Sequence, residues 1–294
     1  MNKKFEYIRA KTPEEACEIK AKYGQKARYL AGGTDLLVEW RRGLTEFKYC
    51  IDLTFISGLK YVKRTKKEWC IGALSTLASL EGAGDGSSLM GCIQETTGRM
   101  CTPQLRTFAT VGGNVSHASP SADLSVLFVA LDAEAKILGA SGERTVAMKD
   151  FFKGVNKTVL REDEMLAEIR VPVPELKVAA SFRRVTRTVI DLAQVNTAVC
   201  LSVDAGGVVS DARIALGAVA PVPMRSETAE TMLVGLEASK IKEDLIEKVS
   251  RQAASDTKPI TDIRASAAYR REVSKVLVRR SIEESIQKLQ GAIS

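Results

Sequence analysis

Two pairs of adjacent glycines, far apart in the chain, have the clearest capacity for binding chemistry. One lies in Ala31-Gly32-Gly33-Thr34-Asp35-Leu36, and the other lies in Thr110-Val111-Gly112-Gly113-Asn114. Because glycine lacks a Cβ atom, the backbone there can adopt positive φ and approach a ligand closely. Consecutive amides in such a turn can converge on anionic oxygens. The two segments therefore predict a diphosphate site, provided that they face one cleft.

The neighbouring sequence predicts elements that would hold these turns in place. An apolar run over 27–31 predicts a strand before the first turn, and Leu36, Leu37 and Trp40 predict a short helix after it. After the second turn, Ser119-Pro120 is typical of an N-cap followed by proline at the first helical position. The apolar run 124–131 then predicts a buried helix. A single Gly-Gly turn is also common in hairpins, so only the two turns together predict a diphosphate site.

Neither glycine segment matches the dinucleotide fingerprint G-x-G-x-x-G or the P-loop pattern, so the Rossmann and Walker classes lack their signatures. Three further motifs accompany the two glycine segments in the chain: Cys101-Thr102-Pro103-Gln104-Leu105-Arg106, the run 118–123 and the run 261–271. Together, in this order and at this spacing, they resemble the FAD-binding subunit of molybdenum hydroxylases. That family includes the medium subunits of xanthine dehydrogenase and carbon monoxide dehydrogenase, and the resemblance covers essentially the whole chain.

The resemblance implies that the chain binds FAD in a two-lobed FAD-binding domain of the PCMH type. Backbone amides of both glycine segments would surround the diphosphate and the ribityl chain, and Thr34, Thr110 and Asn114 would add side-chain hydrogen bonds. The cofactor-binding residues that it implies are Leu30, Ala31, Gly32, Gly33, Thr34, Asp35, Leu36, Met100, Thr110, Val111, Gly112, Gly113, Asn114, Asp123, Leu166 and Arg183.

Several of these residues have a second interpretation. Asp123 would also interact favourably with a helix dipole, and Leu166 would also fit a strand core. Arg183 occupies the place of a basic residue that reaches the isoalloxazine ring, but Arg184 could be its equivalent. The only histidine, His117, has no partner histidine for metal binding, and a structural role is favoured for it. Flavin chemistry resides in the cofactor, so no catalytic residue and no metal ligand is predicted.

The resemblance further implies an electron-transfer function shared among subunits. Substrate would be hydroxylated at a molybdopterin cofactor on a large subunit. Electrons would pass through [2Fe–2S] clusters on a small subunit to FAD on this chain, and then to NAD+ or another acceptor. An alternative is a stand-alone FAD-dependent oxidoreductase of the same fold. The substrate of the complex, the acceptor and the oligomeric state cannot be read from the sequence.

Composition argues against several other classes. The six cysteines are scattered with no C-x-x-C pair, so they do not predict an iron–sulfur or zinc site. The formal net charge of +7 could suggest nucleic acid, but the basic residues are interspersed with acids, and aromatic residues make up only 5%. No apolar stretch reaches the length of a membrane span, and the N-terminus does not resemble a signal peptide. The expected location is the cytoplasm.

The order of predicted elements indicates an α+β chain in three parts. Residues 1–54 predict an N-terminal α/β lobe, opened by Thr12-Pro13 as a capped helix start. Residues 55–174 predict a second α+β lobe with two hairpins, ending at the pair Pro172 and Pro174. Residues 175–294 predict a C-terminal domain in which a small antiparallel sheet is followed by helices.

Overall fold

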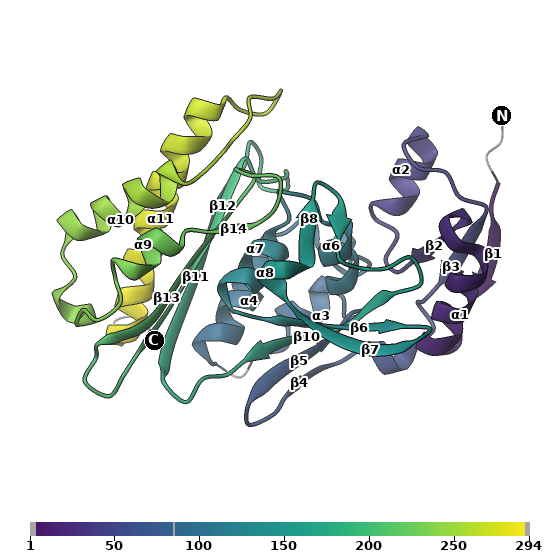
Figure 1. Cartoon of the computed structure of the whole chain (residues 1–294), viewed down its shortest axis with the longest axis horizontal. Helices are drawn as coiled ribbons and strands as arrows, with labels where there is room; N and C mark the ends of the chain where they lie inside the picture. The colour runs from purple at the N-terminus through teal and green to yellow at the C-terminus, as the bar shows by residue number, and fades with distance from the viewer. Residues whose placement is uncertain (1–3, 85, 292–294) are drawn as a thin grey trace.

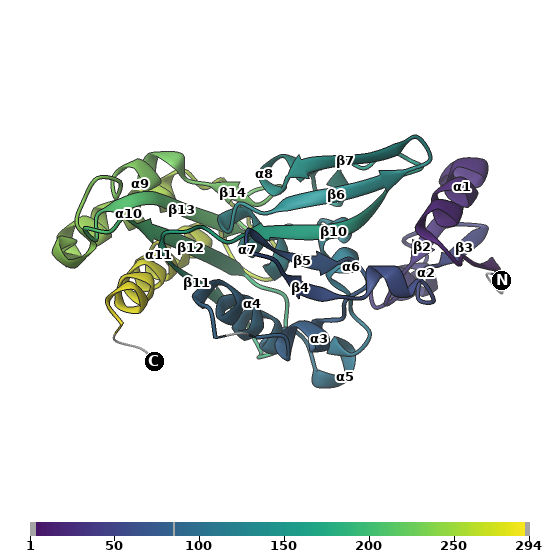
Figure 2. The ribbon, with the colours of Figure 1, turned by 90° about the horizontal axis from the view of Figure 1, so that it is seen from below.

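The computed structural model describes residues 4–84 and 86–291. The chain is elongated: the N-terminal lobe lies at one end, the second lobe in the middle, and the C-terminal sheet with its helices at the other end (Figure 1). The view from below shows the sheet of the second lobe between the two ends (Figure 2). The names N-terminal lobe, second lobe and C-terminal domain stand for residues 4–54, 55–174 and 175–291, after the predicted division of the chain. The predicted α+β class is confirmed.

The N-terminal lobe contains a parallel sheet of three strands in the order β1-β3-β2. Its elements are β1 (Glu6–Arg9), α1 (Pro13–Tyr23), β2 (Ala27–Leu30), α2 (Leu36–Arg42) and β3 (Tyr49–Asp52), with a 3₁₀ turn at Gly24–Lys26. The predicted cap is confirmed, because Thr12 Oγ1 accepts a hydrogen bond from the Glu15 amide at 3.1 Å. The sequence did not predict β1, which is mostly exposed and has no apolar run.

The second lobe contains a five-stranded antiparallel sheet in the order β4-β5-β10-β6-β7, with helices on one side of it. The predicted hairpins β4–β5 and β6–β7 are confirmed. The elements are a 3₁₀ turn at Ser57–Leu59, β4 (Val62–Arg64), β5 (Glu68–Gly72), α3 (Leu77–Glu81), α4 (Ser88–Gly98), α5 (Pro103–Arg106), α6 (Val111–His117), α7 (Asp123–Ala130), β6 (Glu134–Gly139), β7 (Gly142–Ala147), α8 (Met148–Phe151), β8 (Phe152–Gly154), β9 (Lys157–Thr158) and β10 (Met165–Pro172).

The second glycine pair lies inside a helix, which corrects the prediction of a turn ahead of one. Helix α6 begins at Val111 because Thr110 acts as its N-cap, with Thr110 Oγ1 accepting from the Gly113 amide at 3.1 Å. Ala118, with φ of 53°, ends α6 in the left-handed region. The next helix, α7, begins at Asp123 rather than directly after Ser119-Pro120. As predicted, α7 is buried along its whole length.

The C-terminal domain contains a four-stranded antiparallel sheet in the order β11-β12-β13-β14. The predicted hairpin at 204–207 joins β12 to β13. The sequence did not predict β11, whose pair Arg183-Arg184 resembles an exposed charged run. The elements are β11 (Lys177–Val185), β12 (Val195–Val203), β13 (Val209–Gly217), β14 (Met224–Arg225), α9 (Glu227–Thr231), a 3₁₀ turn at Ala238–Lys240, α10 (Glu243–Ser255) and α11 (Ala267–Gln290).

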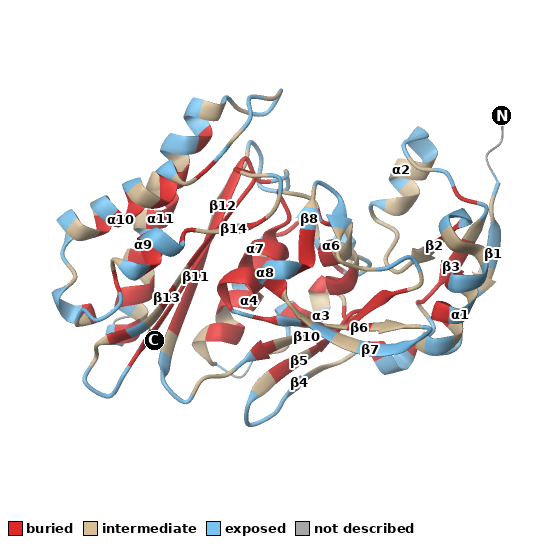
Figure 3. Cartoon of the chain, in the orientation of Figure 1, coloured by how far each residue is buried: buried red, intermediate tan, exposed pale blue. Residues whose placement is uncertain are grey.

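This sheet is a shared layer between two parts of the chain. Helices α11 and α9 cover one face, with α10 packed against both of them, and α4 and α7 of the second lobe cover the other face. Every residue of β12 is therefore buried, as the continuous buried band in Figure 3 shows. Ala180, Phe182 and Ala198 of the sheet belong to the same core cluster as the side chains of α7. The second lobe and the C-terminal sheet thus hold each other in place and form a fixed support for α6.

Candidate functional site

The two glycine segments meet in one cleft of about 950 Å3, which lies between the N-terminal lobe and the second lobe. This satisfies the condition on which the diphosphate prediction depended. One wall comes from the loop between β2 and α2, and the other comes from α6 and β10. The lining residues that the sequence had singled out are Ala31, Gly32, Gly33, Thr34, Asp35, Leu36, Thr110, Gly112, Gly113, Asn114 and Leu166.

Glycine is required at Gly32 and Gly112 by the close approach of backbone from other segments. A Cβ atom at Gly32 would lie 1.9 Å from the carbonyl oxygen of Phe108, in the segment that leads into α6. A Cβ atom at Gly112 would lie 2.6 Å from Cβ of Ala73, just after β5. At Gly33 the requirement is the backbone conformation, since its φ of +71° lies in the left-handed region that favours glycine. The first glycine turn therefore packs directly against the chain that carries the second.

The residues present fit a phosphate-containing cofactor. From Gly32 to Asp35, no backbone amide donates a hydrogen bond to another described residue. Gly32, Gly33 and Thr34 are half-buried along the cleft, so their free amides offer a site for anionic oxygens. In the same cleft the side-chain oxygen of Asn114 is buried and has no partner among the described residues. An oxygen in that position can accept from a ligand hydroxyl.

Five of the residues implied by the resemblance do not line the cleft. Leu30 ends β2, and its carbonyl accepts from the Leu53 amide at 2.9 Å. Val111 and Met100 are buried in the core of the second lobe. Asp123 lies at the boundary with the C-terminal sheet, where it pairs with Arg184, and Arg183 lies in β11 and pairs with Glu284 of α11. Contact of these five residues with FAD stays a prediction.

Arg183 and Arg184 point to opposite faces of β11, as neighbours in a strand do. Arg183 pairs with Glu284 of α11 at 2.7 Å. Arg184 pairs with Asp123 of α7 at 2.5 Å and also donates to the backbone carbonyls of Arg99 and Val189. Arg184 thus ties three segments together around a buried carboxylate, whereas Arg183 faces the C-terminal helices.

His117 lines the cleft at the end of α6, and Glu39 of α2 lies opposite. Their nearest atoms, Nε2 and Oε1, are 3.7 Å apart. The pair joins the two sides of the cleft, because α2 belongs to the N-terminal lobe and α6 to the second lobe. The sequence predicted a structural role for His117, and this contact between lobes is consistent with it.

The charged residues that complete the cleft were not predicted, and among them are Lys20, Arg28, Arg161 and Glu164. Lys20 is buried and donates to the Gly24 carbonyl at 2.7 Å; burial, and then the nearby Arg28, lower the pKa of its ammonium group. Arg28 could have been suspected, since it lies in the strand that enters the first glycine turn. Arg161 and Glu164 come from the loop before β10, and only the fold brings them here.

Glu164 gives a pH-dependent prediction. Its two carboxylate oxygens accept from Arg144 at 2.7 Å each, and these bonds hold the pKa of the carboxyl below its usual value of 4.5. A lowered pKa in the folded state stabilises the fold above pH 4.5, and that contribution is lost as the pH falls through the folded value. We expect Glu164→Gln to lower the free energy of unfolding by about 1.5–3 kcal/mol at pH 7.

Urea denaturation at a series of pH values checks this. The difference between wild type and Glu164→Gln should be largest near neutral pH and should shrink below pH 4.5. A matched variant is Glu143→Gln, because the Glu143 side chain is 61% exposed in its pair with Lys136 and should matter little. A difference for Glu164→Gln that stays constant with pH would contradict the assignment.

Within residues 4–84 and 86–291, no group of three or more His, Cys, Asp or Glu side chains could hold a metal ion. None of the helices in these same ranges is both long and apolar enough to cross a membrane. The six cysteines are all free thiols, and burial raises the pKa of Cys92 to about 12.

Comparison with known proteins gives matches along most of the chain. Residues 3–174 match the family described as the FAD binding domain in molybdopterin dehydrogenase, and residues 180–285 match the CO dehydrogenase flavoprotein C-terminal domain. The carbon monoxide dehydrogenase medium chain of Afipia carboxidovorans is 31% identical over 281 residues, which cover 96% of each chain. The xanthine dehydrogenase FAD-binding subunit of Escherichia coli O157:H7 is 26% identical, with 98% of each chain covered.

Solved structures agree with these sequence matches. The carbon monoxide dehydrogenase from Hydrogenophaga pseudoflava contains a chain that superimposes with a TM-score of 0.91 at 29% identity. The superposition covers 97% of this chain and 98% of that chain. The fold therefore agrees from the N-terminal lobe through the C-terminal helices.

Proposed function

The chain belongs to the family of FAD-binding medium subunits of molybdenum hydroxylases, and on that premise we propose that it is the electron-transfer flavoprotein subunit of a larger dehydrogenase. A large subunit would carry the molybdopterin cofactor, at which substrate is hydroxylated. A small subunit would carry [2Fe–2S] clusters that deliver electrons to FAD on this chain. NAD+ is the acceptor that we favour, and the cytoplasm is the expected location.

The observation that carries this proposal is the meeting of two distant glycine segments in one cleft with unpaired amides. When bound, the flavin supplies the redox chemistry of the subunit. Amides of the 32–35 turn would bind the diphosphate, and Asn114 would accept a hydrogen bond from a hydroxyl of the cofactor. Leu166 lies on the same lining and would offer an apolar contact. Asn114 and Leu166 belong to α6 and β10, and the 32–35 turn packs against the chain that leads into α6.

Purification of the chain from its native source, with measurement of flavin and of associated proteins, tests this function. We expect the flavin spectrum of FAD and co-purification with two further subunits that contain molybdenum and iron. Turnover of a small molecule by the isolated chain would favour the stand-alone oxidoreductase instead. A less likely alternative is a basic nucleic-acid-binding module, which a colourless chain that binds nucleic acid with strong salt dependence would favour.

An exposed apolar patch supports a function within a complex. It consists of large aliphatic side chains on two loops, 186–194 and 256–266, joined where Gln194 donates to the Arg264 carbonyl at 2.7 Å. The patch residues are Val189, Ile190, Leu192, Ile260 and Ile263. Val189 is 81% exposed and Ile263 is 97% exposed. Large apolar side chains exposed together on two joined loops are expected at a protein interface.

The patch gives a direct prediction about assembly. The double variant Val189→Asp/Ile263→Asp should weaken association with partner subunits by more than about tenfold, because charge is disfavoured at the centre of an interface. FAD content should not change, since neither residue lines the cleft. Leu176→Asp is a matched control, as Leu176 is 44% exposed at the opposite end of β11. The measurement is the yield of partner subunits that co-purify with wild type, with the double variant and with Leu176→Asp. Equal yields from the three would exclude this patch as the interface.

A further inference from the structure

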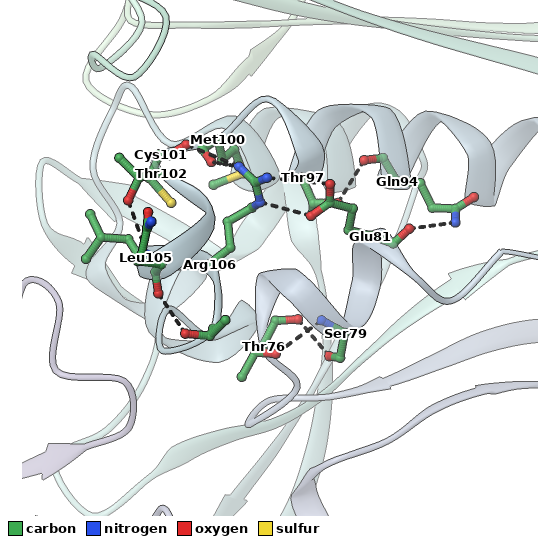
Figure 4. Close-up of polar contacts among 12 residues, drawn as sticks. Thr76, Ser79, Glu81, Gln94, Thr97, Met100, Cys101, Thr102, Leu105 and Arg106 are labelled. Carbon is green, nitrogen blue, oxygen red and sulfur yellow. Dashed lines mark hydrogen bonds and ion pairs between the residues drawn. The ribbon is translucent and has the colours of Figure 1, made fainter.

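An ion pair near the cleft joins the ends of two short helices, with the arginine buried and the glutamate side chain 44% exposed. Glu81 is the last residue of α3, and Arg106 is the last residue of α5. Arg106 Nε lies 2.9 Å from Glu81 Oε2, and the Arg106 residue is only 8% exposed. Figure 4 shows that the same guanidinium also faces the chain between α4 and α5. There, Nη1 donates to the carbonyls of Met100 at 3.0 Å and Cys101 at 3.2 Å.

The chain at these carbonyls has a conformation that needs support. Cys101 has φ of +39°, in the left-handed region that side-chain-bearing residues rarely adopt. Such residues persist where the surrounding structure fixes them. The two hydrogen bonds from Arg106 fix the carbonyls on either side of this backbone. Thr102 then caps α5, accepting from the Leu105 amide at 3.3 Å.

From Arg106 the chain leads directly to the cleft. Two residues later, the Phe108 carbonyl meets the first glycine turn, where a Cβ atom on Gly32 would lie 1.9 Å away. Ala109 and Thr110 then line the cleft. Helix α3 holds this wall as well, because the Leu77 amide donates to the Ala109 carbonyl at 2.9 Å. The pair Glu81–Arg106 thus links both helices that hold the segment 107–110.

We propose that Arg106, itself held by Glu81, is a positioning residue for the FAD site. It fixes the segment from Met100 to Thr110, and so sets how closely that wall packs against the Gly32 turn. The inference rests on the proposed FAD function of the cleft. Arginine is required because its planar group offers one edge to the carboxylate and a further nitrogen to two carbonyls. A lysine could keep the ion pair with Glu81 but could not make all of these contacts together.

Titration of the full chain with FAD tests the proposal, with flavin circular dichroism and thermal unfolding measured on the same samples. We expect Arg106→Lys to weaken FAD binding on the order of tenfold or more, the size of effect seen when the outer partners of metal-ligating side chains are removed. The circular dichroism of bound flavin should change too, because the wall beside it moves. Glu81→Gln, which keeps the shape but loses the charge, should cause smaller changes in the same direction.

Arg99→Lys is the matched control. Arg99 is the C-cap residue directly after α4, beside the same turn, but its side chain is 58% exposed and pairs with Glu95 of α4. FAD affinity and flavin dichroism should therefore stay at wild-type values. If Arg106→Lys does not fold, Glu81→Gln decides the question by the same readouts. Wild-type affinity and dichroism in the folded Arg106 and Glu81 variants would overturn this inference alone, whereas a wild-type chain that binds no FAD would overturn the proposed function.

Discussion

Gly32→Ala is expected to abolish stable FAD binding while leaving the C-terminal domain folded. The added Cβ atom would lie 1.9 Å from the Phe108 carbonyl oxygen and 2.7 Å from its carbon. Both are backbone atoms, so the clash can be relieved only if the two sides of the cleft move apart. Overpacking of this kind costs about 1–3 kcal/mol and occasionally more. The displacement falls at the cleft itself, so the loss should appear mainly as lost affinity for FAD.

Gly91→Ala is the control for this variant. Gly91 lies within α4, and a Cβ atom there would meet no atom within 4 Å. Alanine also favours a helix interior over glycine by about 1 kcal/mol. FAD affinity should be unchanged and thermal stability equal or higher. If Gly32→Ala bound FAD as tightly as Gly91→Ala, the close packing of the two glycine segments would not be needed for binding.

Asp123→Ala is expected to be the most destabilising single substitution that we predict. The Asp123 carboxylate is 4% exposed, and it accepts from Arg184 at 2.5 Å and from the Asn196 amide group at 2.7 Å. Removing it leaves the mostly buried Arg184 guanidinium without its counter-charge. Breaking a buried pair in this way costs about 3–5 kcal/mol. Urea unfolding at neutral pH measures the loss.

Arg187→Ala gives the matching control in the loop that follows β11. Its ion pair with Asp191 is solvent-exposed, with 60% of the Arg187 side chain accessible. Pairs of this kind contribute about 0–1 kcal/mol. A similar loss of stability in the two variants would show that the Asp123–Arg184 pair is not the contact that joins α7 to the C-terminal sheet.

Short-range signals in the sequence predicted much of the fold. The hairpins at β4–β5, β6–β7 and β12–β13 depend on local turns, and the Thr12 cap depends on one residue three positions away. The prediction for the second glycine pair was wrong. The pair indicated a turn, whereas Thr110 caps α6 and the two glycines lie inside that helix. Strand β11 was missed because its burial comes from the packing of α4 and α11 against it, which no local pattern reveals.

The candidate site, like the fold, could be predicted only in part. The glycine segments could be found because close backbone approach demands one residue type, whereas the carboxylates and cations of the cleft wall could not. Glu164 reaches the cleft through the loop before β10, and its partner Arg144 comes from another strand. The ion pairs of Arg183 with Glu284 and of Arg184 with Asp123, on opposite faces of β11, could not be predicted either. Side chains that depend on long-range partners have no signature in a single sequence.

The binding of FAD by the purified full chain, measured by titration of wild type and of Gly32→Ala, tests the central claim most directly. The account predicts a single FAD for each wild-type chain and none retained by Gly32→Ala, with Gly91→Ala behaving as wild type. A wild-type chain that takes up no FAD, or a Gly32→Ala chain that takes it up equally well, would contradict it.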